Sequence, residues 1–279
     1  MISLPDSAFR RLSSLALSEA GLDLQEGKRP FVASRLQKRL RAIGADSFEA
    51  YAAFVEGTDR AAEAERQHLI SALTTNVTSI FRERHHFTLL ARAVAELDRG
   101  PSDPLRIWSA GCSSGEETLS MAMICRTILG AAWTEHVRIL ATDIDYAMLS
   151  LAAHQPEDRD VAKALKAGAE AALGPQLEVP RVTIAELQAG ITYLRHSLTE
   201  PLPVSRPFDV IFCRNVTIYF TPEIQRSVQA WLIERLAASG LLCLGHSERL
   251  HVEASQMRLV APTSYAGKTA SFAEMNPCR

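Results

Sequence analysis

Hydrophobic positions in the first 73 residues recur at helical spacing, with almost no strand signal. One such segment contains Phe9, Leu12, Leu15 and Ala16 and stops near Gly21. A second repeats at helical intervals, ends at Gly44 and contains Val32, Leu36, Leu40 and Ile43. A glycine directly after such a pattern is typical of a helix end. With two further helices expected around residues 47–56 and 60–73, residues 1–73 are predicted to form a small helical domain.

A polar segment follows the helical pattern. Its sequence is TTNVTSIFRERHHF, Thr74–Phe87, and hydroxyl and amide groups ahead of an apolar pair have the form of a loop that caps a helix. The turn-rich run RGPSDP, Arg99–Pro104, ends this region. We therefore assign residues 74–104 to a linker between the helical domain and the rest of the chain.

From residue 105 onward, short apolar runs alternate with helical patterns. Strands are predicted at Ile107–Trp108, Arg138–Thr142, Val182–Ile184, Ile191–Leu194, Phe208–Arg214 and Gly240–Gly245, with a closing hairpin of Arg258–Val260 and Ser264–Lys268. Helices are predicted from Glu116, and at Tyr146–Ala153, Val161–Ala172 and Thr221–Ala238. Continuous apolar runs suit strands that are covered on both faces, and their alternation with helices favours an α/β fold. Residues 105–279 are expected to form a doubly wound parallel sheet.

The segment RIWSAGCSSGEE, Arg106–Glu117, predicts a strand, a tight turn and the start of a helix. Gly111 and Gly115 bracket the turn, where a missing Cβ lets the backbone approach a ligand. A strand that leads into such a turn and helix forms the cofactor crevice of many doubly wound folds. The next strand ends in Asp143 and Asp145, and an acidic residue there can accept hydrogen bonds from both hydroxyls of a ribose. The pattern therefore indicates a site for an adenosine-containing cofactor.

Composition narrows the class of protein. The chain has 279 residues, is 47% hydrophobic and carries a formal net charge of -2, which gives no general attraction to nucleic acid or membrane. No apolar run approaches the length of a spanning helix, and the first residues lack the layout of a secretory signal. A cytoplasmic protein is expected.

One predicted helix is basic along its whole length. Between Gly27 and Ala45 there is no acidic residue, and the basic residues are Lys28, Arg29, Arg35, Lys38, Arg39 and Arg41. Several cations on one face steer association with an anionic surface, so this helix is a candidate docking surface for an acidic partner. A solvated charged face is the other interpretation. Aromatic residues are not interleaved with the cations, so a nucleic-acid module is not expected.

Cysteine and histidine do not predict a metal centre. Five widely spaced cysteines contain no CxxC pair, namely Cys112, Cys125, Cys213, Cys243 and Cys278. Their odd number and spacing favour reduced, packed thiols over a disulfide framework or a zinc site. His85 and His86 are adjacent, so on a helix they diverge by about 100° and do not chelate one metal ion.

Five motifs along the chain resemble those of the CheR-type chemotaxis receptor methyltransferases. They are TTNVTSIFRERHHF, RIWSAGCSSGEE, ATDID, FDVIFCRNVTIYF and GHSE, in the family's order and spacing. The resemblance covers nearly the whole chain. It implies a class I methyltransferase fold, a doubly wound α/β sheet after a small all-helical domain. It also implies S-adenosylmethionine (SAM) as cofactor, S-adenosylhomocysteine (SAH) as product, and esterification of glutamate side chains on the cytoplasmic helices of chemoreceptors.

The same resemblance implies which residues surround the cofactor. They are Asn76, Thr78, Arg82, Gly111, Glu117, Asp143, Ser197, Leu198, Arg214 and Asn215. Within this set, Asp143 is expected to hold the ribose, Ser197 and Leu198 to lie beside the adenine, and the segment 74–82 to cover the methionine end. Residues 74–104 therefore contribute to the cofactor site.

Two further assignments come from the resemblance. Arg82 and Tyr219 are expected to border the position of methyl transfer. On the basic helix, Arg35, Lys38 and Arg39 are expected to face the acidic helical domain of a chemoreceptor, with no nucleic acid and no membrane insertion involved.

The chain departs from the family pattern at four places. Thr118 stands where the family usually has proline, Ser197 replaces an asparagine, and Thr217 replaces a common methionine. The stretch Gln155–Gly190 is rich in alanine, whereas the family has a small antiparallel subdomain there, which in some members holds a receptor's carboxyl-terminal tether. A tether-dependent mode of receptor binding is therefore not expected.

Two alternatives to an active receptor methyltransferase stay open. One is a SAM-binding but catalytically weak relative that acts as a scaffold or regulator. The other is a methyltransferase of the same fold that acts on another protein or a small acid. A nicotinamide dehydrogenase is not favoured, because the glycine turn lacks a full GxGxxG pattern.

Overall fold

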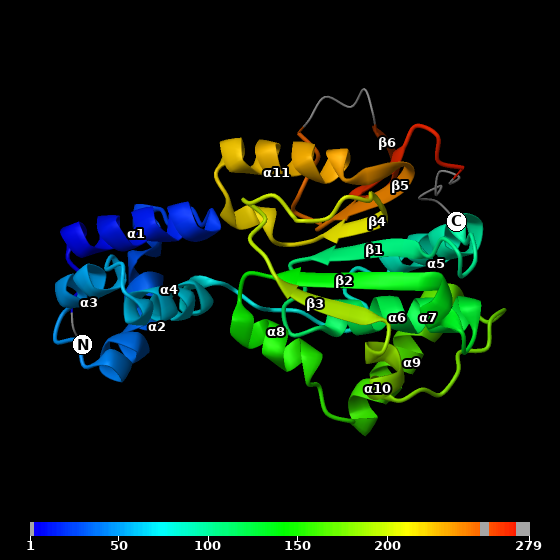
Figure 1. The fold of residues 1–279 in the computed structure, drawn as a ribbon, viewed down its shortest axis with the longest axis horizontal. Coiled ribbons are helices and arrows are strands. Elements are labelled where there is room, and N and C mark those ends of the chain that lie inside the picture. Colours follow the sequence, from blue (N-terminus) through cyan, green and yellow to red (C-terminus); the bar gives the residue numbers. More distant parts are fainter. Residues whose placement is uncertain (1–2, 252–256, 272–279) are drawn as a thin grey trace.

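The amino-terminal part of the chain is a bundle of four helices with its own hydrophobic core (Figure 1). The computed structural model describes residues 3–251 and 257–271, and the bundle comprises α1 (Asp6–Ala20), α2 (Arg29–Ile43), α3 (Phe48–Val55) and α4 (Arg60–Leu73). Gly21 and Gly44 end α1 and α2 in the left-handed conformation, and Ser47 caps α3 through its side chain. The four predicted helices are confirmed.

A single turn of 3-10 helix, η1 (Glu26–Lys28), precedes α2 within the bundle.

Between the bundle and the sheet, α5 (His85–Leu97) follows the polar segment. The residue before α5 is Arg84, and no side chain caps the helix there. The polar segment has the form of a capping loop in the sequence, but none of its side chains caps α5. The hydroxyl of Thr74 and the amide of Asn76 instead donate to the carboxylate of Asp145.

A sheet of seven strands forms the centre of the second part of the chain (Figure 1). The strands are β1 (Leu105–Ala110), β2 (Val137–Asp143), β3 (Ile191–Arg195), β4 (Phe208–Cys213), β5 (Leu236–Leu244), β6 (Met257–Ala261) and β7 (Ser264–Gly267). Their order is β3-β2-β1-β4-β5-β7-β6, with β1 to β5 parallel and β7 antiparallel to β5. The chain moves outward from β1 to β3 and then returns to β4. The strand order therefore reverses beside β1, where ligands bind in doubly wound sheets.

Helices cover both faces of this sheet. The helices and turns of this part are α6 (Glu116–Leu129), α7 (Trp133–His136), α8 (Tyr146–Ala153), α9 (Arg159–Leu173), α10 (Ile184–Gln188), η2 (Thr217–Tyr219) and α11 (Pro222–Glu234). Along β4, Val210 and Phe212 pack into the core shared with α5, α6 and α9. Ile211 and Cys213 face the opposite way and pack into the core shared with α11. The predicted doubly wound α/β fold after a helical domain is confirmed.

Two local predictions are corrected by the structure. Val182–Ile184 is not a strand, because Thr183 forms a capping box with Glu186 and starts α10. The helix predicted at Thr221–Ala238 ends at Glu234, since β5 already begins at Leu236 and pairs with Phe208.

The stretch Gln155–Gly190 contains α9 and α10 and no strand. Of the cysteines, four are buried free thiols, while Cys278 lies outside the described residues. Among the described helices, none has the length and apolar character needed to cross a membrane.

Candidate active site

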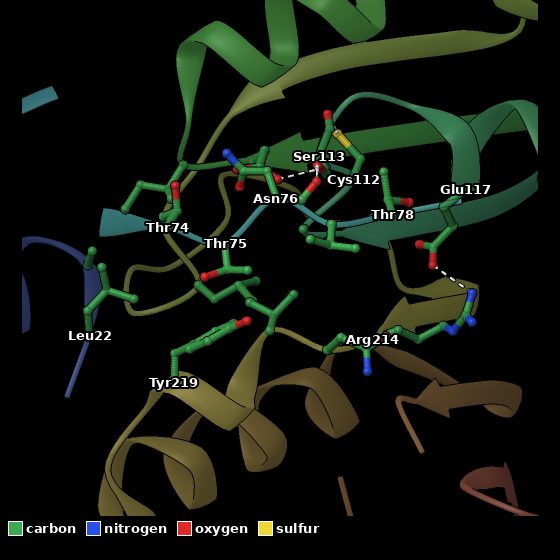
Figure 2. A pocket seen from close by; sticks show the side chains of 18 of the residues that line it. Leu22, Thr74, Thr75, Asn76, Thr78, Cys112, Ser113, Glu117, Arg214 and Tyr219 are labelled. Carbon is green, nitrogen blue, oxygen red and sulfur yellow. Dashed lines mark hydrogen bonds and ion pairs between the residues drawn. The ribbon is translucent and has the colours of Figure 1, made fainter. Parts of the chain in front are cut away.

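A pocket opens between the helical bundle and the carboxyl ends of β1, β2 and β4 (Figure 2). It contains about 920 Å³ of space, including open solvent at its mouth. Every residue that the resemblance assigned to the cofactor or to methyl transfer lines it: Asn76, Thr78, Arg82, Gly111, Glu117, Asp143, Ser197, Leu198, Arg214, Asn215 and Tyr219. Residues far apart in the chain are therefore brought together as expected, although their individual roles stay predictions.

The glycine turn after β1 forms one wall of the pocket. Gly111 has a φ of 96°, and a Cβ built on it would overlap Cγ2 of Val216. The turn therefore needs glycine both for its backbone conformation and for the close approach of the loop after β4. Next to it, Ser113 has a φ of 50°, a strained value for a residue with a side chain.

Asp143 stands at the end of β2 and is tied to the glycine turn. One carboxylate oxygen accepts a hydrogen bond from the backbone N–H of Ser113 at 2.8 Å, and the other accepts from the N–H of Asp145 at 2.9 Å. Burial raises the pKa of Asp143, and these two N–H donors oppose the shift. Asp145, not Asp143, caps α8, and Asp143 lines the pocket.

Glu117 and Arg214 form an ion pair on the pocket floor, drawn as a dashed line in Figure 2. The Nη1–Oε2 distance is 2.9 Å, and the hydroxyl of Ser109 donates to the other oxygen of Glu117 at 2.7 Å. Burial raises the pKa of Glu117, while the Arg214 cation lowers it. The second η-nitrogen of Arg214 donates to the backbone oxygen of Arg82. Arg214 thus links the glycine-turn helix to the polar segment.

Glu248 is a residue whose role the sequence analysis missed. Its carboxylate accepts hydrogen bonds from the backbone N–H groups of Asn215, Val216 and Thr217, at 2.7, 3.1 and 2.8 Å. It also accepts from the N–H of Gly245 at 2.7 Å. Asn215 has a φ of 59°, and this set of bonds holds that strained loop against the pocket. The sequence signal for this role of Glu248 was the acidic residue of the GHSE motif.

The loop over the pocket, residues 74–82, is called the junction loop below. Its last residue, Arg82, donates from Nη1 to the backbone oxygen of Val77 at 2.8 Å. Phe81 and Glu83, on either side of Arg82, have φ values of 51° and 55°. Residues held in this conformation by their surroundings are frequent at active sites. Arg82 therefore occupies a fixed place on the pocket wall.

Tyr219 lies opposite the junction loop, with its ring in the pocket (Figure 2). Its backbone oxygen accepts a hydrogen bond from the N–H of Asp23 at 2.8 Å, and the Lys28 ammonium lies 5.7 Å from the centre of its ring. Asp23 and Lys28 belong to the segment that leads into α2. The segment before the basic helix therefore contacts the edge of the pocket.

The wall after β3 carries the residues expected beside the adenine. Ser197 and Leu198 are both buried, and the hydroxyl of Ser197 is 2.8 Å from that of Thr199. His196, which the sequence analysis did not single out, also lines the pocket and lies near the rings of Trp108 and Trp231. Burial lowers the pKa of His196.

Two of the departures from the family pattern have local partners. The hydroxyl of Thr118 donates to the backbone oxygen of Gly115 at 2.8 Å, and the hydroxyl of Thr217 donates to Glu248 at 2.7 Å. Both side chains are buried. Each buried hydroxyl therefore has a hydrogen-bond partner.

The basic face of α2 is smaller than the sequence suggested. Arg35 and Lys38 are exposed. Arg39 instead turns inward, where its Nε lies 2.9 Å from Glu65, a residue that is 4% exposed and also accepts from the hydroxyl of Tyr51. Without Arg39 the Glu65 charge would be buried and unpaired. The expectation that Arg39 offers its charge to a partner is therefore corrected.

Two family models match consecutive parts of the chain. The model described as the CheR methyltransferase all-alpha domain matches residues 7–74. The model described as the CheR methyltransferase SAM binding domain matches residues 76–266.

Curated proteins are similar over almost the whole length. A chemotaxis protein methyltransferase of Escherichia coli K12 is 35% identical over 95% of this chain and 92% of its own length. One from Salmonella typhimurium LT2 is 36% identical over 95% of this chain and 91% of its own. A solved structure titled PKMT2 from Rickettsia typhi in complex with AdoHcy is 15% identical, covers 61% of this chain and 26% of that one, and has a TM-score of 0.36, too low to support a conclusion.

Proposed function

Because this chain belongs to the CheR methyltransferase family, we propose that it transfers a methyl group from SAM to glutamate side chains of chemoreceptors, forming glutamate methyl esters. The observation that carries this proposal is the single pocket in which all the expected cofactor and methyl-transfer residues meet. Its position at the reversal of strand order is that of a nucleotide-type ligand site in a doubly wound sheet.

The residues of the pocket fit SAM. Gly111 lines the pocket, and Val216 packs in the space that a side chain at this position would take. The Asp143 carboxylate offers acceptors suited to the two ribose hydroxyls, and Leu198 offers an apolar surface suited to an adenine ring. The polar groups of the junction loop and Glu117 suit the charged methionine end. Each of these residues is proposed, on this basis, to hold the part of the cofactor that the resemblance implies.

The reaction requires little acid–base chemistry from the protein. When bound, SAM supplies a methyl group that its sulfonium makes electrophilic. A substrate glutamate has an ordinary pKa of about 4.3 and is already ionised at neutral pH, so no side chain of this protein needs to act as a general base. The guanidinium of Arg82 stays protonated and is suited to orient that carboxylate through two parallel hydrogen bonds.

Exclusion of water is the second contribution that we assign to the protein. Water stabilises a separated carboxylate and cation more than a transition state in which their charges disappear. Apolar side chains on three sides of the pocket keep water out: Ala20 and Leu22 from the bundle, Leu198 from beyond β3, and Val216 and Phe220 from beyond β4. We place Tyr219 at the mouth of this apolar region, where its ring lines the path to the methyl group.

For the substrate, we propose that α2 docks on the acidic cytoplasmic helices of a chemoreceptor. Arg35 and Lys38 are exposed on α2 and free of the internal ion pair that holds Arg39. Since Lys28, just before α2, lies over the ring of Tyr219, a helix bound along α2 would run close to the pocket mouth. Several cations at this place favour an anionic partner.

Calorimetry with SAM and SAH, followed by receptor methylation, tests the proposal. We expect both to bind and the purified protein, given SAM, to esterify glutamates of chemoreceptor cytoplasmic fragments but not glutarate. Binding without transfer to any acceptor would support a scaffold, and transfer to glutarate alone would support a small-acid enzyme. Failure of the protein to bind either compound would contradict all three.

A further inference from the structure

One buried carboxylate, that of Asp145, joins three parts of the molecule. The side chain is 1% exposed and lies at the start of α8. One oxygen accepts hydrogen bonds from the backbone N–H groups of Ala147 and Met148, at 2.9 and 3.3 Å. The other accepts from the hydroxyl of Ser71 on α4 at 2.9 Å and from the amide of Asn76 in the junction loop at 2.8 Å. Asp145 is outside the set of residues that line the pocket.

The charge of Asp145 is stabilised by neutral donors. In the part of the chain that the structure describes, its hydrogen-bond donors are backbone N–H groups, two hydroxyls and one amide. The N-terminus of α8 adds its favourable dipole. Hydrogen bonds to a buried charged group are stronger than those between neutral groups. The hydrogen bonds that Asp145 accepts from Ser71 of the bundle and Asn76 of the junction loop are therefore among the stronger hydrogen bonds between these parts of the chain.

These contacts fix one pocket residue, Asn76, from two sides. Its side-chain amide donates to Asp145, and its backbone oxygen accepts from the hydroxyl of Ser113 at 3.1 Å, the dashed line beside Asn76 in Figure 2. Ser113 in turn donates its N–H to Asp143, and the N–H of Asp145 also donates to Asp143. The junction loop, the glycine turn and the end of β2 thus form one closed set of hydrogen bonds.

We infer that Asp145 is a positioning residue of the methyltransferase, which holds Asn76 and the junction loop in register with Asp143 and the adjoining glycine turn of the cofactor pocket. The inference rests on the proposed function. Asp145 does not touch the pocket itself, so its effect on the cofactor passes through Asn76 and Asp143. Losing this contact lets the junction loop leave its place, so that SAM binds less tightly.

Asp145→Asn in the full chain is the test, because asparagine caps a helix as well as aspartate does. The new amide keeps one oxygen for Ala147 and Met148, but its NH₂ group cannot accept from Asn76. Asp158→Asn is the matched control, since Asp158 caps α9 through Asp160 and Val161 and lies outside the pocket. We expect Asp145→Asn to weaken SAH binding about tenfold in calorimetry, the equivalent of about 1.4 kcal/mol, and Asp158→Asn to leave it unchanged.

Steady-state kinetics separate positioning from a general loss of structure. Asp145→Asn should raise KM for SAM about as much as it weakens SAH binding, with kcat at saturating SAM nearly kept. A variant that is merely less folded would lose kcat without a change in KM. If wild-type protein binds SAH and a folded Asp145→Asn binds it equally well, the inference is wrong while the proposed function stands. If wild-type protein does not bind SAH, the inference and the proposed function are both wrong.

Ser71→Ala keeps the inference testable if Asp145→Asn does not fold. Ser71 lies on α4, outside the pocket, and its substitution removes one donor to Asp145 without altering the carboxylate. We expect SAH binding to weaken about threefold, in line with the loss of one hydrogen bond. Unchanged binding by Ser71→Ala would overturn the inference.

Discussion

The guanidinium of Arg214 pairs with the carboxylate of Glu117 across the pocket floor, with 2.9 Å between Nη1 and Oε2. Glu117 belongs to the first turn of α6 and Arg214 follows the end of β4. The pair therefore ties the glycine-turn helix to the neighbouring strand at the point where the strand order reverses. Because 2% of the Arg214 side chain and 12% of the Glu117 side chain are exposed, the Glu117 charge depends on Arg214, while Arg214 also has Glu83 at 3.7 Å.

Glu117→Gln removes the nearer of two carboxylates beside the buried Arg214, the other being Glu83 at 3.7 Å. We expect the free energy of unfolding, measured with urea, to fall by about 1.5–3 kcal/mol, as for the loss of a hydrogen bond to a charged group. Glu116→Gln is the control, because Glu116 is the neighbouring residue of α6 but does not line the pocket. Equal stability of the two variants would contradict this role of the ion pair.

Asp143→Ala removes the acceptor that we assign to the ribose. Binding of SAH should weaken by about 1–3 kcal/mol, the range for lost hydrogen bonds at a buried polar group. Calorimetry checks this prediction. A variant that is folded and binds SAH like the wild type would show that Asp143 does not hold the cofactor.

The raised pKa of Asp143 predicts a pH dependence of binding. Burial raises this pKa above its ordinary value of 3.8, and only the ionised carboxylate accepts from both ribose hydroxyls. Affinity for SAH should therefore be highest above the raised pKa and be lost as the pH falls through it, beginning at pH values where an ordinary aspartate is still ionised. In Asp143→Asn this part of the pH dependence should disappear, and its persistence would assign it to another group.

Gly111→Ala tests the close approach at the glycine turn. A Cβ at this position would overlap Val216, and the φ of 96° is unfavourable for alanine. Gly130→Ala is a matched control, since Gly130 has a φ of 74° but nothing within 4 Å of its added Cβ. Gly111→Ala should lower the free energy of unfolding by about 1 kcal/mol more than Gly130→Ala, with SAH affinity lowered only in the former. Equal losses of unfolding free energy in both variants would show that the positive φ, and not the overlap with Val216, disfavours alanine at position 111.

The features that the sequence predicted correctly are those with a local signal. The turn at Gly111, the continuous apolar run of β4 and the glycine ends of α1 and α2 depend on neighbouring residues alone. The helix–strand boundary at Leu236 was misplaced because residues 236–238 read as helical, and only pairing with Phe208 makes them a strand. The capping box of α10, in contrast, was a local signal that was overlooked.

The missed parts of the site depend on contacts between distant residues. Arg35 and Arg39 lie one turn apart on the same helix and look alike in the sequence. Only the position of Glu65 on α4 separates the exposed cation from the paired one. Likewise, Glu248 holds the loop at Asn215 from more than thirty residues away. Such assignments need the packing of whole elements, which no local pattern contains.

The difference between exposed and paired arginines on α2 gives a further prediction. Arg35→Glu combined with Lys38→Glu should lower receptor methylation strongly, with SAH affinity and stability kept, because these side chains are exposed. Arg39→Glu should instead lower the free energy of unfolding by about 2 kcal/mol, since it places a second carboxylate beside Glu65. Methylation assays, calorimetry and urea unfolding check the three effects. Unimpaired methylation by the double variant would contradict docking through α2.

Transfer of a labelled methyl group from SAM to a chemoreceptor cytoplasmic fragment tests the central claim most directly. The account predicts label on glutamate residues that is released by base, as a methyl ester is. It also predicts a rate about 100-fold lower for Arg82→Gln, which lines the pocket, and an unchanged rate for the neighbouring control Arg84→Gln, which does not. Absence of base-labile label from a protein that binds SAM, or equal rates for both variants, would contradict the account.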